Sequence, residues 1–224
     1  MSNNAIAKTR PQTNQRRQFM TISLLALGAA IGDWRSFAAT DEAMSMSEHE
    51  HHHHMMNSGA PVKRSVADYK VPAVKLVRND GATVAFPQEI DDGRPVILNF
   101  IYTSCTTICP LTSQVLSYVQ GLLERSHDNA HIVSISIDPE YDTPARLTAY
   151  AEKYHAGGRW QHYTGTLEAS IAMQKAFNAY RGDKMNHTPL TFLRSAPGKT
   201  WVRLDGFANP DEVVGEFHKL VAAQ

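Results

Sequence analysis

The sequence is poor in cysteine, has no excess of charge of either sign, and lacks a long uninterrupted apolar run. Only 2 of its 224 residues are cysteine, which excludes the many-bridged framework of a small secreted protein. Basic and acidic residues number 22 each, so the clustered positive charge of a nucleic-acid binder is missing. The 13 Gly and 11 Pro are too few for collagen or general disorder. With 42% hydrophobic residues, we expect a folded core.

The first forty residues have the order of an export signal. A polar stretch leads to Arg16 and Arg17, an apolar run covers residues 21–32, and small residues follow near Ala38. Because Asp33 ends the run short of the roughly 20 residues that a membrane-spanning helix needs, a cleaved signal is favoured over a permanent anchor. The twin arginines resemble a twin-arginine signal, with the general secretion route and an uncleaved anchor as alternatives. Removal of residues 1–38 would leave a mildly acidic chain in an oxidising compartment.

The next segment, up to Ala60, is dominated by methionine and histidine. Its only large apolar residues are methionines, so it cannot build a core and is predicted to be a disordered linker. Thioether and imidazole groups suit copper and related ions, which favours a metal-collecting role. A solvated linker with incidental histidines and an expression tag are the alternatives. The donor residues are Met44, Met46, His49, His51, His52, His53, His54, Met55 and Met56.

From Pro61 onward, short apolar runs alternate with amphipathic stretches, which is the order of an α/β domain. Two of the runs are apolar nearly throughout, as in central strands covered on both faces. Asn209 and Pro210 form a favourable helix start, and residues 196–199 read as the turn of a final hairpin. Strands are predicted at 74–77, 83–86, 96–101, 132–137, 190–193 and 201–204, and helices at 111–125, 144–154, 167–180 and 210–222.

The two cysteines, Cys105 and Cys109, follow the predicted strand 96–101 and open a predicted helix. The free N–H groups and dipole of a helix N-terminus favour a thiolate, which makes a thiol reactive. At this spacing both thiols are expected one turn apart on one helical face, close enough to oxidise together or to bind one ion. The alternative is an inert pair or a structural disulfide, which would stabilise the fold by only about 2–3 kcal/mol because its loop is short.

A histidine is the expected third ligand of a metal bound by these thiols. Two thiolates do not complete a structural zinc site, whereas Cu(I) accepts fewer ligands and prefers soft ones. His187 lies in a polar loop directly before the predicted strand 190–193, although an ordinary solvated histidine also fits that position. The remaining histidines of the folded part are expected at helix ends or surface turns: His127, His131, His155, His162 and His218.

Several segments together resemble the Sco/SenC family. They are Cys105–Pro110 after one strand, Ser136–Pro144 after the next, Trp160 with Thr164–Gly165, and His187 before a late strand. The resemblance spans roughly residues 67 to 224 in order. It implies a thioredoxin-like three-layer α/β domain, a central mixed sheet flanked by helices, that binds one copper through Cys105, Cys109 and His187. It also implies a role in assembling the binuclear copper centre of cytochrome c oxidase, as copper donor, as thiol reductant of the target's cysteines, or as both.

The predicted layout is therefore an export signal at 1–38, a Met/His-rich linker at 39–66 and the Sco/SenC-like domain at 67–224. The expected location is the periplasm, with membrane contact only through association or an uncleaved signal. The expected partners are the apoprotein of a copper enzyme, such as a cytochrome c oxidase subunit, and a thiol reductant; no nucleic acid is expected.

The chain departs from the family pattern at the site. Thr106, Thr107 and Ile108 stand where the family often has an acidic residue, and the Met185–Asn186 pair stands where it often has Val-Asp. The Thr188–Pro189 bond is similar to the cis-proline that faces the thiols of thioredoxins, and a cis bond would favour thiol–disulfide exchange. Two further motif residues, Asp138 and Asp142, fit a helix-start or turn role equally well.

Three functions follow from these features. The first is a copper metallochaperone with an incompletely filled metal shell. The second is a thiol–disulfide oxidoreductase in which the more exposed thiol, predicted to be Cys105, attacks first. The third is a copper sensor or buffer that binds the ion through its Met/His segment. A peroxidase ranks below all three because no additional feature of the sequence requires it.

Overall fold

The structure is a computed structural model that describes residues 61–223, and every structural statement below concerns that part of the chain. The predicted export signal and most of the Met/His-rich linker lie outside the described residues. Among those residues, no helix is both long enough and apolar enough to cross a membrane.

A mixed eight-stranded sheet forms the centre of the described domain, with the strand order β1-β8-β7-β4-β5-β6-β2-β3. The central strands β4, β5 and β6 are parallel, and all other neighbouring strands are antiparallel. The strands are β1 (Lys63–Ala67), β2 (Lys75–Arg78), β3 (Thr83–Ala85), β4 (Val96–Ile101), β5 (His131–Ser136), β6 (Trp160–Thr164), β7 (Leu190–Arg194) and β8 (Trp201–Asp205).

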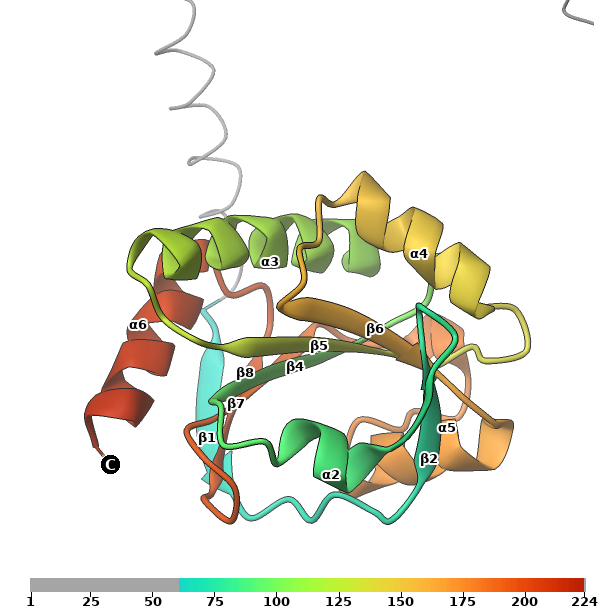
Figure 1. The fold of residues 1–224 in the computed structure, drawn as a ribbon, viewed down its shortest axis with the longest axis horizontal. Coiled ribbons are helices and arrows are strands. Elements are labelled where there is room, and N and C mark those ends of the chain that lie inside the picture. Colours follow the sequence, from blue (N-terminus) through green and yellow to red (C-terminus); the bar gives the residue numbers. More distant parts are fainter. Residues whose placement is uncertain (1–60, 224) are drawn as a thin grey trace, which may run out of the picture. The chain divides into compact units, whose positions relative to one another are not determined.

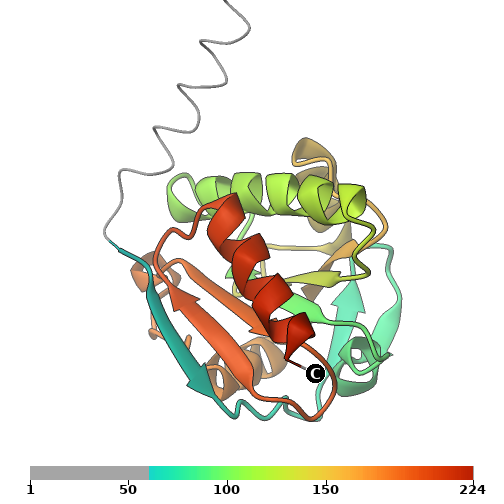
Figure 2. The ribbon, with the colours of Figure 1, turned by 90° about the vertical axis from the view of Figure 1, so that its left-hand side faces the viewer.

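Helices cover both faces of this sheet, which confirms the predicted α/β architecture. Figure 1 shows α3 and α4 on one side of the sheet and α2 and α5 on the other. Turned by 90°, Figure 2 shows α6 crossing in front of the sheet and meeting α3, against which it packs. The helices are α2 (Phe86–Ile90), α3 (Ile108–Arg125), α4 (Pro144–Lys153), α5 (Leu167–Ala176) and α6 (Pro210–Ala222), with a short 3-10 turn η1 (Lys184–Asn186).

The core is densest around β4 and β5, in which every residue is buried. An aromatic cluster packs on β4: the ring of Phe177 lies 5.0 Å from that of Phe192 and 6.0 Å from that of Phe100, between centroids. Edge-to-face pairs of this kind add stability beyond the area that they bury. The carboxyl end of β4, from which the cysteine loop departs, therefore rests on a rigid base.

The sequence predicted the buried strands and the last helix well. The strand at 96–101, the helix at 210–222 and the hairpin that joins β7 to β8 are confirmed. Helix α3 begins at Ile108 rather than residue 111, and α5 ends at Ala176 rather than residue 180. Residue 86, predicted as the end of a strand, instead begins α2.

Two strands were missed because their sequences lack a clear apolar pattern. The strand β6 reads Trp-Gln-His-Tyr-Thr, and β1 reads Lys-Arg-Ser-Val-Ala. Because β1 pairs with β8 at the sheet edge, the folded part begins at about Lys63, inside the segment that was predicted as linker.

Candidate metal centre

The two cysteines lie in the connection from β4 to α3. Cys105 precedes the helix and Cys109 lies in its first turn, so the prediction that both sit on one helical face is wrong. They are nevertheless adjacent: the backbone N–H of Cys109 donates to the Sγ of Cys105 at 3.4 Å. The N-cap residue of α3, Thr107, makes no side-chain hydrogen bond to the helix. The sulfur of Cys105 instead accepts from the N–H of Cys109, a free N–H of the first turn that a capping side chain usually binds. Both thiols are free.

The two thiols differ in their affinity for a proton. Burial opposes ionisation of Cys105, but the backbone N–H groups of Cys109 and Thr107 and the hydroxyl of Tyr102 stabilise its thiolate and lower its pKa to about 7. Burial raises the pKa of Cys109 well above the usual thiol value, despite the N–H of Tyr102 that reaches its Sγ at 3.5 Å. Cys105 is also the more exposed thiol, at 8% against 0% for Cys109. At neutral pH the pair therefore combines a partly ionised outer thiol with a protonated inner one.

A buried carboxylate fixes the loop that carries Cys105. Asp142 is fully buried and accepts from the Thr103 hydroxyl at 2.5 Å, from the Thr103 N–H at 3.1 Å and from the Ser136 hydroxyl at 2.6 Å. It thus joins the ends of the parallel strands β4 and β5. The cap of α4 is Thr143, not Asp142, and the backbone carbonyl of Asp138 closes the turn before it. Asp142 is a positioning residue, a role that its sequence motif alone did not reveal.

His187 is buried, with only 6% of its surface exposed, and its ring is fixed by one hydrogen bond. Its Nε2 lies 3.0 Å from the carbonyl oxygen of Phe100; a carbonyl only accepts, so Nε2 carries the proton and donates. That tautomer leaves Nδ1 with a free lone pair. Burial lowers the pKa of His187, which keeps the ring neutral. A neutral imidazole whose second nitrogen donates to a backbone carbonyl is the usual form of a metal ligand.

The structure brings the cysteines together but does not close a three-ligand site around them. Within residues 61–223, no three His, Cys, Asp or Glu side chains are close enough together to hold a metal ion. His187 instead faces the edge of Tyr102, with 6.5 Å between the ring centroids, and the same Tyr102 contacts the thiols. His187 would have to move toward the thiols for its nitrogen to join the two sulfurs in one site.

The turn that precedes His187 is held from two sides. The side chain of Asp183 accepts from the N–H of Met185 at 2.9 Å, and Lys184 forms an ion pair with Asp138 at 2.5 Å. The Met185 side chain is 72% exposed, and its Sδ lies 3.8 Å from the Tyr102 hydroxyl, which donates to it.

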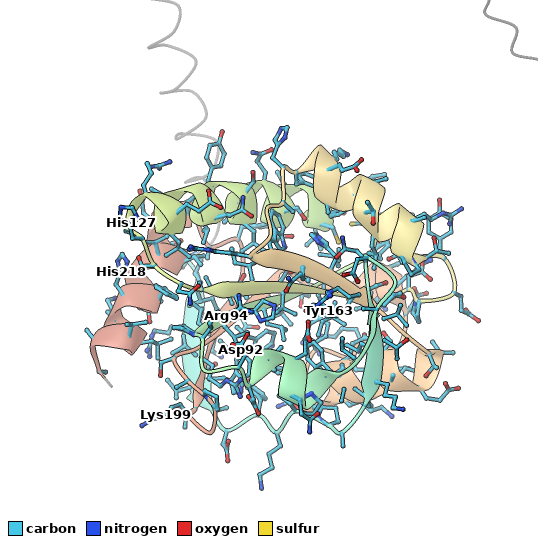
Figure 3. The ribbon with its side chains drawn as sticks, viewed as in Figure 1. Asp92, Arg94, His127, Tyr163, Lys199 and His218 are labelled. Atoms are coloured by element: carbon cyan, nitrogen blue, oxygen red, sulfur yellow. The ribbon has the colours of Figure 1, made fainter. Side chains whose placement is uncertain are left out.

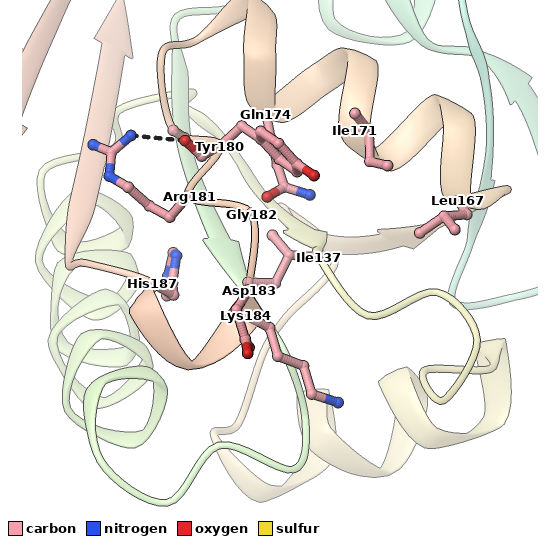
Figure 4. Close-up of a pocket in the computed structure, with 11 residues that line it drawn as sticks. Ile137, Leu167, Ile171, Gln174, Tyr180, Arg181, Gly182, Asp183, Lys184 and His187 are labelled. Carbon is pink, nitrogen blue, oxygen red and sulfur yellow. Dashed lines mark hydrogen bonds between the residues drawn. The ribbon is translucent and has the colours of Figure 1, made fainter.

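A cavity of about 230 Å³ lies beside this turn, as Figure 4 shows. Neither cysteine is among its lining residues, which are Ile137, Leu167, Ile171, Gln174, Ala179, Tyr180, Arg181, Gly182, Asp183, Lys184 and His187. The thiols are therefore not part of this cavity, and the turn has open space on one side.

The other histidines lie away from the thiols, but not all where the sequence predicted. Figure 3 shows His127 and His218 at the end of α3 and on α6, and His218 pairs with Asp128 at 2.9 Å. His131 and His162 are buried strand residues of β5 and β6, so their predicted position at helix ends or surface turns is wrong. The sequence analysis missed both positions because a histidine reads as a polar break: His131 directly precedes the predicted strand 132–137, and His162 lies in β6, which was not predicted.

The Thr188–Pro189 bond is trans, since residues 61–223 contain no cis peptide. The feature that would have favoured thiol–disulfide exchange through a cis-proline is therefore absent from this loop.

A buried strand followed by Cys105 in the loop and Cys109 in the first turn of the next helix, on a mixed sheet with helices on both faces, defines a thioredoxin-like protein with two adjacent free thiols. Residues 62–222 match the SCO1/SenC family, so the chain belongs to that family. The family predicted from the motifs is thereby confirmed.

The relatives agree with this assignment. The SCO1 protein homolog of Bacillus subtilis is 27% identical over 159 residues, which cover 66% of this chain and 81% of that protein. Protein SenC of Rhodobacter capsulatus is 34% identical over 106 residues, or 47% of this chain and 46% of that protein.

Solved structures confirm the fold. Yeast Sco1 with copper bound superposes with a TM-score of 0.61 at 18% identity, covering 70% of this chain and 96% of that one. BsSco superposes with a TM-score of 0.60 at 25% identity, covering 71% of this chain and 98% of its own. BsSco is described as a member of the Sco family of cytochrome c oxidase assembly proteins in which a disulfide switch was identified.

Proposed function

We propose that this chain is an exported copper metallochaperone. Cys105, Cys109 and His187 bind one Cu(I), the cargo, and deliver it to a copper enzyme such as the binuclear copper centre of cytochrome c oxidase. The observation that carries the proposal is the pairing of two adjacent thiols, one of which has a pKa of about 7, with a neutral His187 that has a free Nδ1. The copper-bound yeast relative and the oxidase-assembly role of BsSco support it.

The same arrangement accounts for release of the ion. Three ligands leave the coordination of Cu(I) open, so a thiolate of the target can bind the ion before a chaperone ligand leaves it. Among these three ligands Cys105 is the most exposed and Cys109 the least, so of the three Cys105 is expected to exchange first. A periplasmic location, as the export signal predicts, would place the chain beside such exported targets.

The test is an anaerobic Cu(I) titration of the chain from residue 39 onward, reduced and disulfide-oxidised. We expect one tight equivalent only in the reduced protein, because the disulfide removes both thiolates. In His187→Ala the reduced protein should bind Cu(I) about tenfold or more weakly, as when a metal site loses a ligand or its support. The matched control is His218→Ala, an exposed histidine of α6, which should bind as the unchanged protein does.

Equal affinity in the His187→Ala and His218→Ala proteins would remove His187 from the site. Loss of all tight binding on deletion of residues 41–60 would contradict the thiol site as a whole. It would favour a copper buffer that acts through the Met/His segment.

A second function, thiol–disulfide exchange, is favoured by the difference in pKa between the thiols. The Cys105 thiolate would attack a disulfide of the target, forming a mixed disulfide and releasing one target thiolate. Cys109, after losing its proton, would attack the Cys105 sulfur and release the second target thiolate, leaving a Cys105–Cys109 disulfide that an external thiol reductant must reduce.

The test of this second function is trapping of the mixed disulfide. Cys109→Ser should accumulate it through Cys105, because the resolving thiol is missing, whereas Cys105→Ser should not. Mass spectrometry after reaction with a disulfide-bonded peptide reads out the adduct. Failure of both variants to trap it would count against the exchange function and leave copper binding untouched.

A further inference from the structure

Three sulfur atoms surround one buried tyrosine at the site. Tyr102 donates its backbone N–H to the Sγ of Cys109 at 3.5 Å, and its hydroxyl is near enough to Cys105 to help lower the pKa of that thiol. The same hydroxyl lies 3.8 Å from the Sδ of Met185. A phenol has a single proton to donate, so it can satisfy only one of these two sulfurs at a time. A weak and replaceable contact therefore joins the thioether of Met185 to the tyrosine whose backbone N–H reaches the Cys109 sulfur.

The backbone at Met185 is held by contacts within its turn and with Asp138, while the Met185 side chain is exposed. Its N–H is held by Asp183, and the adjacent Lys184 is tied to Asp138. The side chain has three rotatable bonds and is 72% exposed, so it can change rotamer at little cost. Asp183, Lys184 and His187 line the cavity beside the turn, as Figure 4 shows, which leaves space for the turn to shift.

We propose that Met185 supplies a fourth, soft and exchangeable ligand to the copper ion bound by Cys105, Cys109 and His187. This inference rests on the proposed copper site. A thioether suits Cu(I), and as a neutral ligand it adds no charge to an ion that already has two thiolates. Met185 and His187 belong to the same turn and lie on either side of one residue, so the movement that brings the imidazole to the ion also brings the thioether.

The ligand distinguishes the two oxidation states of copper. A thioether stabilises Cu(I) far more than Cu(II), which prefers nitrogen and oxygen donors. Because Met185 is the most exposed of the four groups, it is also the first that a thiolate of the target can displace. Met185 would thus hold the reduced ion on the chaperone until a stronger soft donor arrives.

The test uses the reduced chain from residue 39 onward with Met44, Met46, Met55 and Met56 replaced by leucine, so that Met173 and Met185 are its only methionines. This protein is compared with its Met185→Leu variant. Leucine preserves the size and apolar character of the side chain and removes only the sulfur. Met173→Leu is the matched control, because Met173 is fully buried in α5 and outside the site. Each protein is made with selenomethionine, and copper X-ray absorption measures whether a selenium atom lies in the first coordination shell. Competition with a chromophoric chelator measures the affinity for Cu(I), and a separate titration measures that for Cu(II).

We expect a copper–selenium contact in the starting protein and in Met173→Leu, and none in Met185→Leu. The Cu(I) affinity of Met185→Leu should fall about tenfold, the lower end of the loss for a supporting group of a metal site, while its Cu(II) affinity stays unchanged. A selenium contact that survives in Met185→Leu, or an unchanged Cu(I) affinity, would overturn the proposal. If the protein without the Met185→Leu change binds no copper tightly when reduced, the proposed copper site itself is wrong. That result can be told apart from the two outcomes that overturn only the role of Met185.

Discussion

The thiols of Cys105 and Cys109 differ because of the backbone N–H groups that reach them. The outer sulfur receives the N–H of Cys109 at the start of α3, whereas the inner sulfur is surrounded by the core and receives a single N–H from Tyr102. Hydrogen bonds to a thiolate lower the pKa of the thiol, whereas burial raises it. The two cysteines therefore differ in pKa although they are only four residues apart.

This difference predicts the pH dependence of thiol reactivity in the reduced, copper-free protein. The pKa of Cys105, lowered to about 7, means that its thiolate fraction is half at pH 7, rises above it and falls below it. Iodoacetamide should therefore label Cys105 with a rate that increases with pH and is half-maximal at about pH 7. Cys109 should stay unlabelled in the folded protein. Peptide mapping of the labelled sites measures both rates, and equal labelling of the two cysteines at pH 7 would contradict the assignment.

Some residues at the site can be predicted from the sequence, whereas others are found only in the structure. Spacing, motifs and the family resemblance predict Cys105, Cys109 and His187 as site residues, and the structure brings the two cysteines, but not His187, into direct contact. The contacts of Asp142 with Thr103, and of Tyr102 with Met185 and His187, join segments far apart in sequence, and no local pattern predicts such contacts. The exposure of Met185 was likewise invisible, since a methionine in a polar loop gives no signal of direction.

Among the elements, α6 shows how a local signal succeeds. Its start is a capping box: Asn209 accepts from the N–H of Glu212 at 2.9 Å, and the Glu212 side chain accepts from the N–H of Asn209 at 2.8 Å. Pro210 follows at the first helical position. All these residues are adjacent in sequence, which is why the helix was predicted with its observed bounds.

Loss of this cap should destabilise the domain by a defined amount. Asn209→Ala removes the acceptor for the N–H of Glu212, and the free energy of unfolding should fall by about 1 kcal/mol. Asp211→Ala, which changes an exposed acid in the same turn, is the matched control and should cost under about 0.5 kcal/mol. Urea unfolding followed by circular dichroism measures both. Equal losses in the two variants would contradict a specific contribution of the Asn209 cap to the stability of α6.

Strands were predicted less evenly than helices. Buried on both faces, β4 is apolar throughout and easily recognised, whereas β6 contains Gln161 and His162 and was missed. Gln161 has an internal partner, because His131 Nε2 lies 2.5 Å from its side-chain oxygen across the β5–β6 pair, whereas His162 stacks on the ring of Trp160. Tertiary contacts of this kind override composition, and they appear only once the sheet is assembled.

Buried neutral histidines affect the stability of the whole domain in acid. His162 is fully buried, its ring stacks on Trp160 with 5.2 Å between centroids, and neither of its nitrogens has a hydrogen-bond partner among the described residues. Burial lowers its pKa from 6.5 to about 3. Between these values the unfolded chain binds a proton that the folded domain does not, so the free energy of unfolding decreases as the pH falls below 6.5.

The expected loss from this one residue is about 2 kcal/mol between pH 7 and pH 5. His162→Phe keeps a planar ring beside Trp160 and removes the titrating group, so its unfolding free energy should change less over the same range. Urea unfolding at pH 7, 6 and 5 measures the slope for each protein. The same slope in both would show that other groups cause the acid sensitivity.

The strand order of the sheet also decides where a partner protein can bind. Its two edges are β1, which carries Lys63 and Arg64, and β3, which has only three residues. Short edges and edge cations discourage a foreign strand from extending a sheet. Recognition by strand addition is therefore disfavoured at both edges, and so is edge-to-edge association between copies of this chain. The target of the proposed copper transfer is expected to bind by another mode, which leaves the sheet itself unextended.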